Sequence, residues 1–338
     1  MIKYLFAIAS IFFILFFAWL FFPSFDLYGA TPLISWQKLS LAMPYKSFND
    51  FSYAVAEKRL FVFNGQNFFY SDDFEKWHEV KETPEFSIYH REEPFALTWF
   101  NNRLWAFFNQ DGNAVWSSKD GRNWQLEADK INKSGRVHGK ICTFNSKLWL
   151  INSWDEGDIF NSDDGKVWNK VGQTGFSNVI IKNLFVFKNE LWLIGHDWGN
   201  FFKSADGKTW HRARLNFPGP YRNGATFGVF DNKLWLIGGE RGYSMRETIK
   251  ADPFFFLFFL NPQGTSRKMK DLSDTWYSED GINWVCNSKS ERKNFLEIKA
   301  FNLGDRFILI GDAGNFSYNS APASPEDKYI WEAISAKP

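Results

Sequence analysis

One seven-residue phrase recurs along this chain and constrains its fold more than any other feature. The phrase is Ser-x-Asp-Gly-x-x-Trp, and its intact copies begin at Ser118, Ser162, Ser204 and Ser278. A variant runs from Ser71 to Trp77 with Phe74 in place of the glycine, and a degraded version runs from Ser324 to Trp331. A phrase that returns at a near-constant period indicates a repeat architecture.

A second phrase of aliphatic and aromatic residues gives an independent measure of the period. Its leucines are separated by 44, 44, 43 and 43 residues, and a phenylalanine follows 73 residues later, at Leu60, Leu104, Leu148, Leu191, Leu234 and Phe307. Both phrases count six units. Both also place one insertion in the fifth unit, which we assign to residues 241–272.

Each unit is predicted to form four short strands. In the third unit these strands are residues 137–144, 147–151, 158–161 and 166–171, and Asn145-Ser146 is a two-residue hairpin turn. Units of about 40–50 residues with four strands are typical of β-propellers, whose blades stack around an axis because none can bury its own face. The predicted fold class is therefore all-β, a six-bladed β-propeller over residues 51–335.

The Ser-x-Asp-Gly phrase has the chemistry of a tight turn between the third and fourth strands. Aspartate hydrogen-bonds the nearby backbone and glycine tolerates positive φ. We expect the tryptophan that follows to cover its own hairpin and to maintain the fold. The phrase resembles the Asp-box of sialidase-like (BNR) propellers, with one residue fewer between Asp and Trp. Leu234 to Gly239 resembles the second strand of kelch propellers.

The two ends of the repeat region leave the closure of the ring open. Residues 36–39 look like an additional fourth strand without the three strands that should precede it. We expect one end of the chain, near Trp36 or near Trp331, to complete the ring by pairing with the other. Residues 23–50 are accordingly assigned to a linker and a ring-closing strand.

The amino-terminal segment is predicted to be a transmembrane or signal helix over residues 1–22. Residues 4–22 are uncharged and mostly apolar, which is close to the length that crosses a bilayer, and Lys3 precedes them. The positive charge before the span predicts the amino end inside and the propeller on the extracytoplasmic side, periplasmic or at the cell surface. Cleavage of a signal peptide and secretion is the alternative.

The insertion in the fifth unit is unusually oily. It contains Phe254, Phe255, Phe256, Phe258 and Phe259 between two prolines, a run too short to span a bilayer. Three roles are open for this run: a cap over the propeller, a contact with the membrane surface, or a contact with a partner protein.

Charge and cysteine content exclude some classes of function. The net charge is +1 and basic residues are scattered, so the sequence has no electrostatic footprint for nucleic acid. Cys142 and Cys286 fall in different units and are expected to be buried free thiols. No pair of residues has metal-ligand spacing, and we expect neither a metal nor a cofactor.

A ligand is expected on the face opposite the Ser-x-Asp-Gly turns, around the axial opening. The loops predicted to lie there carry polar side chains, which we take as candidate ligand-binding residues: Arg136, His138, Asp155, His196, Asp197, Tyr221, Arg222, Glu240 and Arg241. The resemblance to sialidases implies three arginines for a substrate carboxylate, a Tyr–Glu pair and an aspartate acid/base. The Arg-Ile-Pro signature of that family is absent, and no Tyr–Glu pair can be assigned.

These observations favour a membrane-anchored extracytoplasmic propeller that acts as a binding or scaffolding module for a glycan or protein ligand. Two alternatives stay open. One is a carbohydrate-active enzyme, either a sialidase-like glycoside hydrolase or a kelch-type sugar epimerase. The other is an assembly factor that contacts its partner through the phenylalanine-rich run.

Overall fold

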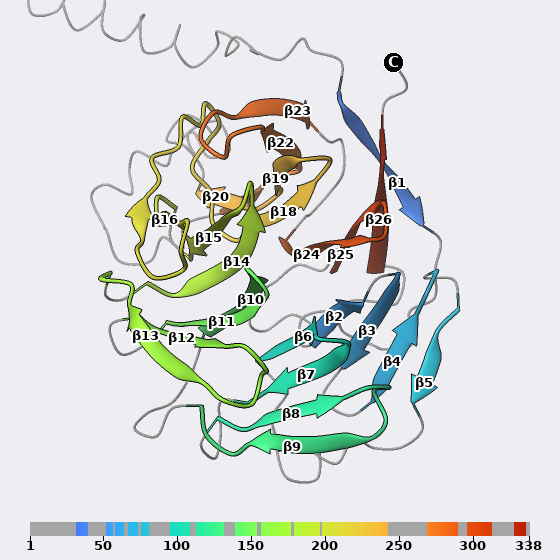
Figure 1. Cartoon of the computed structure of the whole chain (residues 1–338). Helices are drawn as coiled ribbons and strands as arrows, with labels where there is room; N and C mark the ends of the chain where they lie inside the picture. Colours follow the sequence, from blue (N-terminus) through green and yellow to red (C-terminus); the bar gives the residue numbers. More distant parts are fainter. Residues whose placement is uncertain are drawn as a thin grey trace, which may run out of the picture.

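Six four-stranded antiparallel sheets surround a common axis, so the predicted all-β, six-bladed propeller is confirmed (Figure 1). The computed structural model describes residues 32–39, 52–56, 58–63, 67–73, 76–80, 95–108, 113–131, 139–153, 157–176, 179–196, 198–242, 269–289, 296–312 and 328–335. The innermost strands of successive blades are neighbours around the axis.

The first three blades each take four consecutive strands, ordered from the axis outwards. Blade one consists of β2 (Ser52–Ala56), β3 (Arg59–Phe63), β4 (Phe68–Ser71) and β5 (His78–Val80). Blade two consists of β6 (Ala96–Phe100), β7 (Arg103–Phe107), β8 (Val115–Ser118) and β9 (Trp124–Ala128). Blade three consists of β10 (Gly139–Phe144), β11 (Lys147–Asn152), β12 (Asp158–Ser162) and β13 (Asn169–Gln173).

Blade four keeps this order, and only blades five and six depart from it. Blade four consists of β14 (Ile181–Phe187), β15 (Glu190–Gly195), β16 (Phe201–Ser204) and β17 (His211–Arg212). Blade five consists of β18 (Thr226–Phe230), β19 (Lys233–Ile237), β22 (Asp274–Ser278) and β23 (Val285–Lys289). A two-stranded sheet of β20 (Glu240–Gly242) and β21 (Met269–Asp271) leaves this blade, and the phenylalanine-rich run between them lies outside the described residues. Blade six consists of β24 (Leu296–Leu303), β25 (Arg306–Asp312), β26 (Lys328–Ser335) and β1 (Ile34–Leu39).

Two-residue turns join the first and second strands as the sequence predicted. Asn145 and Ser146 have φ values of 48° and 59°, and the corresponding pairs in blades two, four and five are also positive at both positions. Positive φ at both central residues is the signature of a type I′ hairpin, whose twist matches that of the flanking strands. The turns explain why Asn, Asp and Ser recur at these positions.

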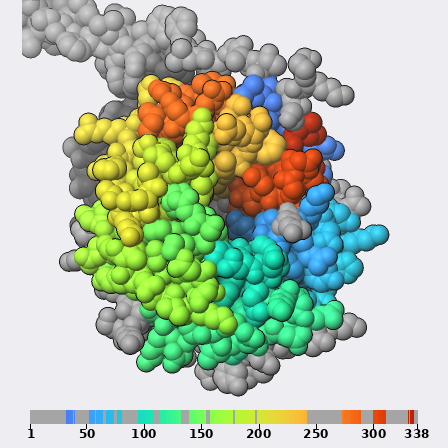
Figure 2. Space-filling model, in the orientation of Figure 1, coloured from blue at the N-terminus to red at the C-terminus, as the bar shows by residue number. Residues whose placement is uncertain are grey.

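Both ends of the chain build blade six. The amino-terminal strand β1 pairs antiparallel with β26 along its whole length, from Ile34 opposite Ser335 to Leu39 opposite Ile330. Figure 2 shows the colours running once around the molecule, so that the blue amino-terminal strand meets the red carboxyl-terminal blade. Trp331 lies on the third strand, between Leu309 and Lys38, so the degraded phrase that ends at Trp331 does not lead into a fourth strand as the intact copies do. Trp36 takes the fourth-strand position instead, because the ring closes between two chain ends and needs no covalent turn there.

Asn287 on β23 holds β1 against the neighbouring blade. Its buried side-chain oxygen accepts hydrogen bonds from the backbone N–H groups of Leu33 at 2.7 Å and Ile34 at 3.2 Å. Its side-chain nitrogen donates to the carbonyl of Ile34 at 3.0 Å and to Thr275 Oγ1 at 3.0 Å. One amide therefore connects blade five to the strand that closes blade six.

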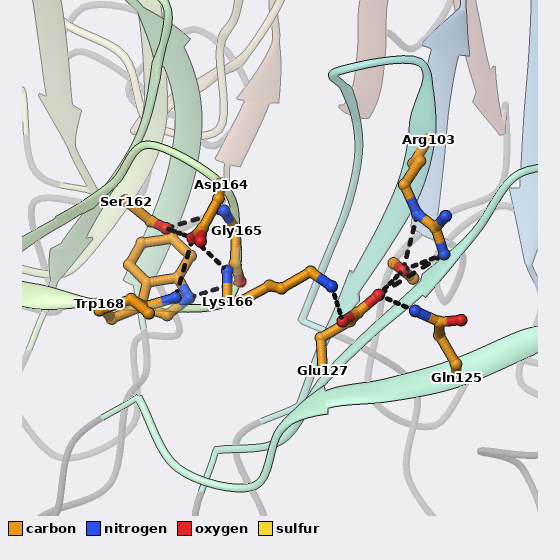
Figure 3. A network of polar contacts seen from close by, with 10 residues as sticks. Arg103, Gln125, Glu127, Ser162, Asp164, Gly165, Lys166 and Trp168 are labelled. Carbon is orange, nitrogen blue, oxygen red and sulfur yellow. Dashed lines mark hydrogen bonds and ion pairs between the residues drawn. The ribbon is translucent and has the colours of Figure 1, made fainter.

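The four intact Ser-x-Asp-Gly turns share their serine and aspartate hydrogen bonds, and those of blades two, three and four share the tryptophan bond as well. In blade three the N–H of Gly165 donates to Ser162 Oγ at 2.8 Å, and the N–H groups of Lys166 and Val167 donate to Asp164 Oδ1, each at 2.9 Å. Trp168 Nε1 donates to the carbonyl of Gly165 at 2.9 Å (Figure 3). The side chains thereby satisfy the backbone groups that a tight turn leaves without strand partners.

The tryptophans of these turns pack between blades, and the expectation that each covers its own hairpin was incomplete. The Trp168 ring of blade three meets Phe107 of blade two edge-on, with centroids 5.7 Å apart. Trp124 of blade two meets Phe68 of blade one in the same way, also at 5.7 Å. The reason is that the sheets stack face to face, so a large apolar ring at the outer edge of one sheet is buried by the preceding sheet.

The turn glycines take part in the same contact. A Cβ built on Gly165 would lie 2.4 Å from Trp105 Cη2 in blade two, and one on Gly207 would lie 2.6 Å from Trp149 Cη2 in blade three. Gly281 stands in the same relation to Trp192 of blade four. The two recurring phrases of the sequence therefore meet in space, the turn of one blade against the second-strand tryptophan of the blade before it.

A polar network reinforces the contact between blades two and three. Lys166 Nζ, which follows the blade-three turn, lies 2.7 Å from Glu127 Oε2 on β9 (Figure 3). Ser117 Oγ donates to Glu127 Oε1 at 2.6 Å, and the side-chain amide of Gln125 donates to the same oxygen. Desolvation acts to raise the pKa of Glu127, but the hydrogen bonds from Lys166, Ser117 and Gln125 outweigh it and lower that pKa.

Candidate functional site

The loop face of the propeller carries the candidate site. The strands of each blade alternate in direction, so the first-to-second and third-to-fourth turns share one face, and the remaining loops share the other. In blades four and five the second face is formed by His196, by residues 198–200, by the connection at 213–225 and by the residues after β19. These segments position the part of the predicted site that the structure describes.

The structure describes five of the nine predicted ligand-binding residues. His196, Tyr221, Arg222, Glu240 and Arg241 all lie on the loop face of blades four and five. The other four, Arg136, His138, Asp155 and Asp197, lie outside the described residues and stay predictions. The phenylalanines of the insertion also lie outside the described residues and stay predictions.

Arg222 is buried, and its guanidinium is occupied by blade five. Its Nη1 and Nη2 atoms lie 2.6 Å and 3.0 Å from the two carboxylate oxygens of Asp274, a bidentate pair, and the side chain is 0% exposed. Nη1 also donates to the carbonyl of Gly238 at 3.1 Å, and Nε donates to the carbonyl of Pro220 at 3.3 Å. As placed, Arg222 stabilises the loop between blades four and five and does not present a free fork to a ligand.

Asp274 completes a rigid base for this loop. Trp276 Nε1 donates to Asp274 Oδ2 at 2.7 Å, and the Arg222 guanidinium lies 5.2 Å from the centroid of Phe217. The sequence did not single out Asp274 or Phe217. Asp274 is 52 residues from Arg222, with the insertion between them, so no local signal pairs them.

An aromatic surface stands on that base. Tyr221 is 76% exposed, and its ring centroid lies 6.2 Å from that of Trp198. Trp198 is half-buried and is held edge-on against Phe201 at 5.2 Å and tilted against Phe217 at 5.0 Å. We call Trp198 and Tyr221 the aromatic surface. Its two rings come from different loops, and packing underneath fixes the inner one.

The remaining predicted residues, His196, Glu240 and Arg241, lie on other segments of the loop face of blades four and five. His196 is exposed, and its backbone N–H donates to the carbonyl of Ile180 at 2.7 Å, which ties the blade-four loop to the start of β14. Glu240 is half-buried and exchanges two backbone hydrogen bonds of 2.8 Å with Asn223. Arg241 pairs with Lys270 in the small sheet that leaves blade five. The tertiary structure thus brings together loops from two blades that the sequence lists separately.

The thiols and acidic groups of the described residues give no sign of metal chemistry. Neither Cys142 on β10 nor Cys286 on β23 forms a disulfide, and both are half-buried where full burial was expected. Desolvation raises the pKa of the Cys142 thiol to about 12, which suppresses the reactive thiolate. Within the described ranges, no group of three or more His, Cys, Asp or Glu side chains is arranged to hold a metal ion.

Comparisons with known proteins agree with the fold. Residues 92–183, which span blades two and three and reach the first residues of β14, match a family model described as the DUF6242 beta propeller domain. A solved structure of YjhT has a TM-score of 0.54 at 12% sequence identity, covering 86% of this chain and 95% of that one. A structure of YCF48 bound to D1 peptide has a TM-score of 0.48 at 16% identity, covering 89% and 82%. No curated protein matches the sequence. At this identity the likeness to YjhT shows the β-propeller fold alone.

The membrane prediction concerns residues that the structure does not describe. Among the described residues, no helix is long and apolar enough to cross a membrane. Residues 1–22 lie outside them, so the signal-anchor stays a prediction.

Proposed function

We propose that this protein is a membrane-anchored, extracytoplasmic binding module that takes a glycan or protein ligand on the aromatic surface of blades four and five. The observation that carries the proposal is the 76% exposure of Tyr221 beside the half-buried Trp198. Large aromatic side chains supply much of the binding energy where protein surfaces meet ligands.

The base under the aromatic surface supports a binding role. The Arg222–Asp274 pair and the Trp198–Phe217 contact fix the loops before any ligand arrives. A surface that is ordered in advance loses less conformational entropy on binding, and this raises its affinity. The polar groups of His196 and Glu240 on the neighbouring segments would orient a ligand by hydrogen bonding.

The proposed location rests on the amino-terminal sequence. Residues 4–22 would form the anchor, with Lys3 on the inner side. The ring-closing strand begins at Ile34, so a short connection would join anchor and propeller and hold the ring near the membrane. The proposal includes the resemblance to Asp-box and kelch propellers. It also includes a contact of the phenylalanine-rich run with the membrane or with a partner.

A carbohydrate-active enzyme receives no specific support from the described residues. The one described arginine at the centre of the candidate site, Arg222, already binds Asp274 with both terminal nitrogens. The proposal therefore claims binding without turnover.

The test is a glycan panel and photo-crosslinking, both with the full-length chain. We expect Tyr221→Ala to weaken ligand binding at least about tenfold, because a hot-spot aromatic contributes about 2 kcal/mol or more. Val167→Ala is the matched control, since Val167 is a 63%-exposed apolar residue on the opposite, turn face. If no glycan binds, a photoreactive residue at position 221 should capture a protein partner that the same residue at position 167 does not. Equal losses in both alanine variants, or equal capture at both positions, would refute the proposal.

A further inference from the structure

The innermost strands carry lysines at one level of the axis, near the loop face. Six residues occupy equivalent registers, each opposite the fifth residue of its blade's second strand, and none of them is acidic: Ser52, Ala96, Lys140, Asn183, Thr226 and Lys299. The first strands run from the loop face towards the turn face, so this level lies near the opening on the loop side.

A second lysine joins Lys140 from the next blade. Lys182 is the extra residue of a bulge in β14, where the pairing with β15 shifts between Ile181 and Asn183. Strands β10 and β14 are neighbours, Lys140 is half-buried, and Lys182 is exposed. Both lysines therefore stand near the loop-side ends of neighbouring innermost strands. Desolvation, followed by repulsion from Lys182, lowers the pKa of Lys140, in agreement with this placement.

Neither of these lysines has a carboxylate partner among the described residues, whereas other lysines of the same two blades do. Nζ atoms lie within 2.9 Å of a carboxylate oxygen in four pairs: Lys147–Asp163, Lys166–Glu127, Lys170–Asp158 and Lys203–Glu190. Among the described residues, one half-buried cation is thus held beside a second without an anion, an arrangement that costs free energy. A bound anion would remove that cost and would form charge-assisted hydrogen bonds with both ammonium groups.

We propose that Lys140 and Lys182 form an anion-binding site at the loop-side opening of the propeller axis, for a carboxylate or sulfate group of a ligand. His196 follows β15 and is hydrogen-bonded to Ile180 at the start of β14, so this site lies on the axial side of the loop that carries Trp198. A ligand that spans both features would be an acidic one. The anion site rests on the two lysines alone and does not require the aromatic surface to bind.

The experiment follows lysine side chains by NMR in the full-length protein. Reductive ¹³C-dimethylation labels each ammonium and keeps its charge. Sodium sulfate and sodium acetate are titrated separately against chloride at constant ionic strength. We expect saturable shifts of the Lys140 and Lys182 signals with at least one of the two anions, and no saturable shift at Lys147, which is paired with Asp163. The anion that saturates identifies the group.

Variants make the inference falsifiable. Lys182→Gln should lower the affinity for the anion, measured at the Lys140 signal, by about tenfold, which is the effect of losing one charge–charge contact. Because Lys182 is exposed, this substitution should not disturb folding. Lys147→Gln changes the net charge equally and should leave the titration unchanged. Linear shifts with both anions, or equal weakening in the two variants, would overturn the site. Tyr221→Ala should leave anion binding intact, so failure of the aromatic surface and failure of the anion site are separable.

Discussion

Replacing Gly165 by alanine tests how the blades are joined. Gly165 has φ of +80°, where an L-residue costs about 1–2 kcal/mol. Its Cβ would also lie 2.4, 2.5 and 2.7 Å from three atoms of the Trp105 ring, which is 1% exposed and cannot swing away. Overpacking of this kind costs about 1–3 kcal/mol more. We therefore expect Gly165→Ala to lower the free energy of unfolding by about 2–5 kcal/mol.

Gly175→Ala separates the two contributions. Gly175 has φ of +75°, and nothing lies within 4 Å of an added Cβ. This variant should lose only the backbone contribution of about 1–2 kcal/mol. The difference between the two variants measures the clash between the blade-three turn and blade two.

The assay is urea unfolding monitored by tryptophan fluorescence, and the free energies of unfolding are compared between variants whose m-values are equal. A third variant, Gly165→Ala with Trp105→Leu, should lose less than the sum of its single variants, because the smaller side chain makes room for the new methyl group. Equal losses for Gly165→Ala and Gly175→Ala, or strict additivity in the double variant, would refute the argument that the turn glycine is required by its neighbour.

Three further predictions concern contacts within and between blades. Asn287→Ala leaves two backbone N–H groups at the start of β1 without their acceptor, so we expect a loss of about 1–3 kcal/mol and faster deuterium exchange in β1; unchanged exchange there would count against the clamp. Glu127→Gln should lower the free energy of unfolding by about 1–3 kcal/mol, because the 5%-exposed carboxylate binds Lys166 and Ser117. Glu190→Gln removes a carboxylate from a more exposed pair with Lys203 and should lower it by under about 1 kcal/mol in the same urea assay. Backbone hydrogen bonds from Thr209 and Lys208 lower the pKa of Asp206 to about 2, below its unfolded value. This carboxylate therefore stabilises the fold above about pH 4, and its contribution is lost as the pH falls towards 2. Asp206→Asn should reduce the fall in the free energy of unfolding between about pH 4 and 2, and an unchanged fall would exclude this cause.

Repeat periodicity predicted the architecture because the hairpins of each blade are determined by interactions between residues close in the sequence. The paired polar residues of the hairpin turns demand positive φ, and the Ser-x-Asp-Gly phrase satisfies its own backbone within a few residues. Such interactions depend on neighbours in the chain, so they are visible without a structure. The degraded phrase that ends at Trp331 is an exception, because the strand there is the third of its blade.

The candidate site was only partly accessible to the same reasoning. Loop positions follow from strand order, so His196, Tyr221 and Arg222 were correctly placed on one face. Their roles depend on partners that are distant in sequence. Asp274 converts Arg222 from an apparent ligand-binding residue into a buried support, and a bulge in β14 brings Lys182 beside Lys140.

The sequence by itself determined the six four-stranded units, their turns and the position of the insertion, because hydrogen bonds and side-chain alternation within a hairpin are local. Only the tertiary structure decided how the units meet. It placed β1 beside β26, set the turn glycines of blades three, four and five against a tryptophan of the preceding blade, and gathered Trp198 and Tyr221 on one face. These contacts arise when sheets that cannot bury their own faces stack around an axis, so they depend on the closed ring and on no single segment of the chain.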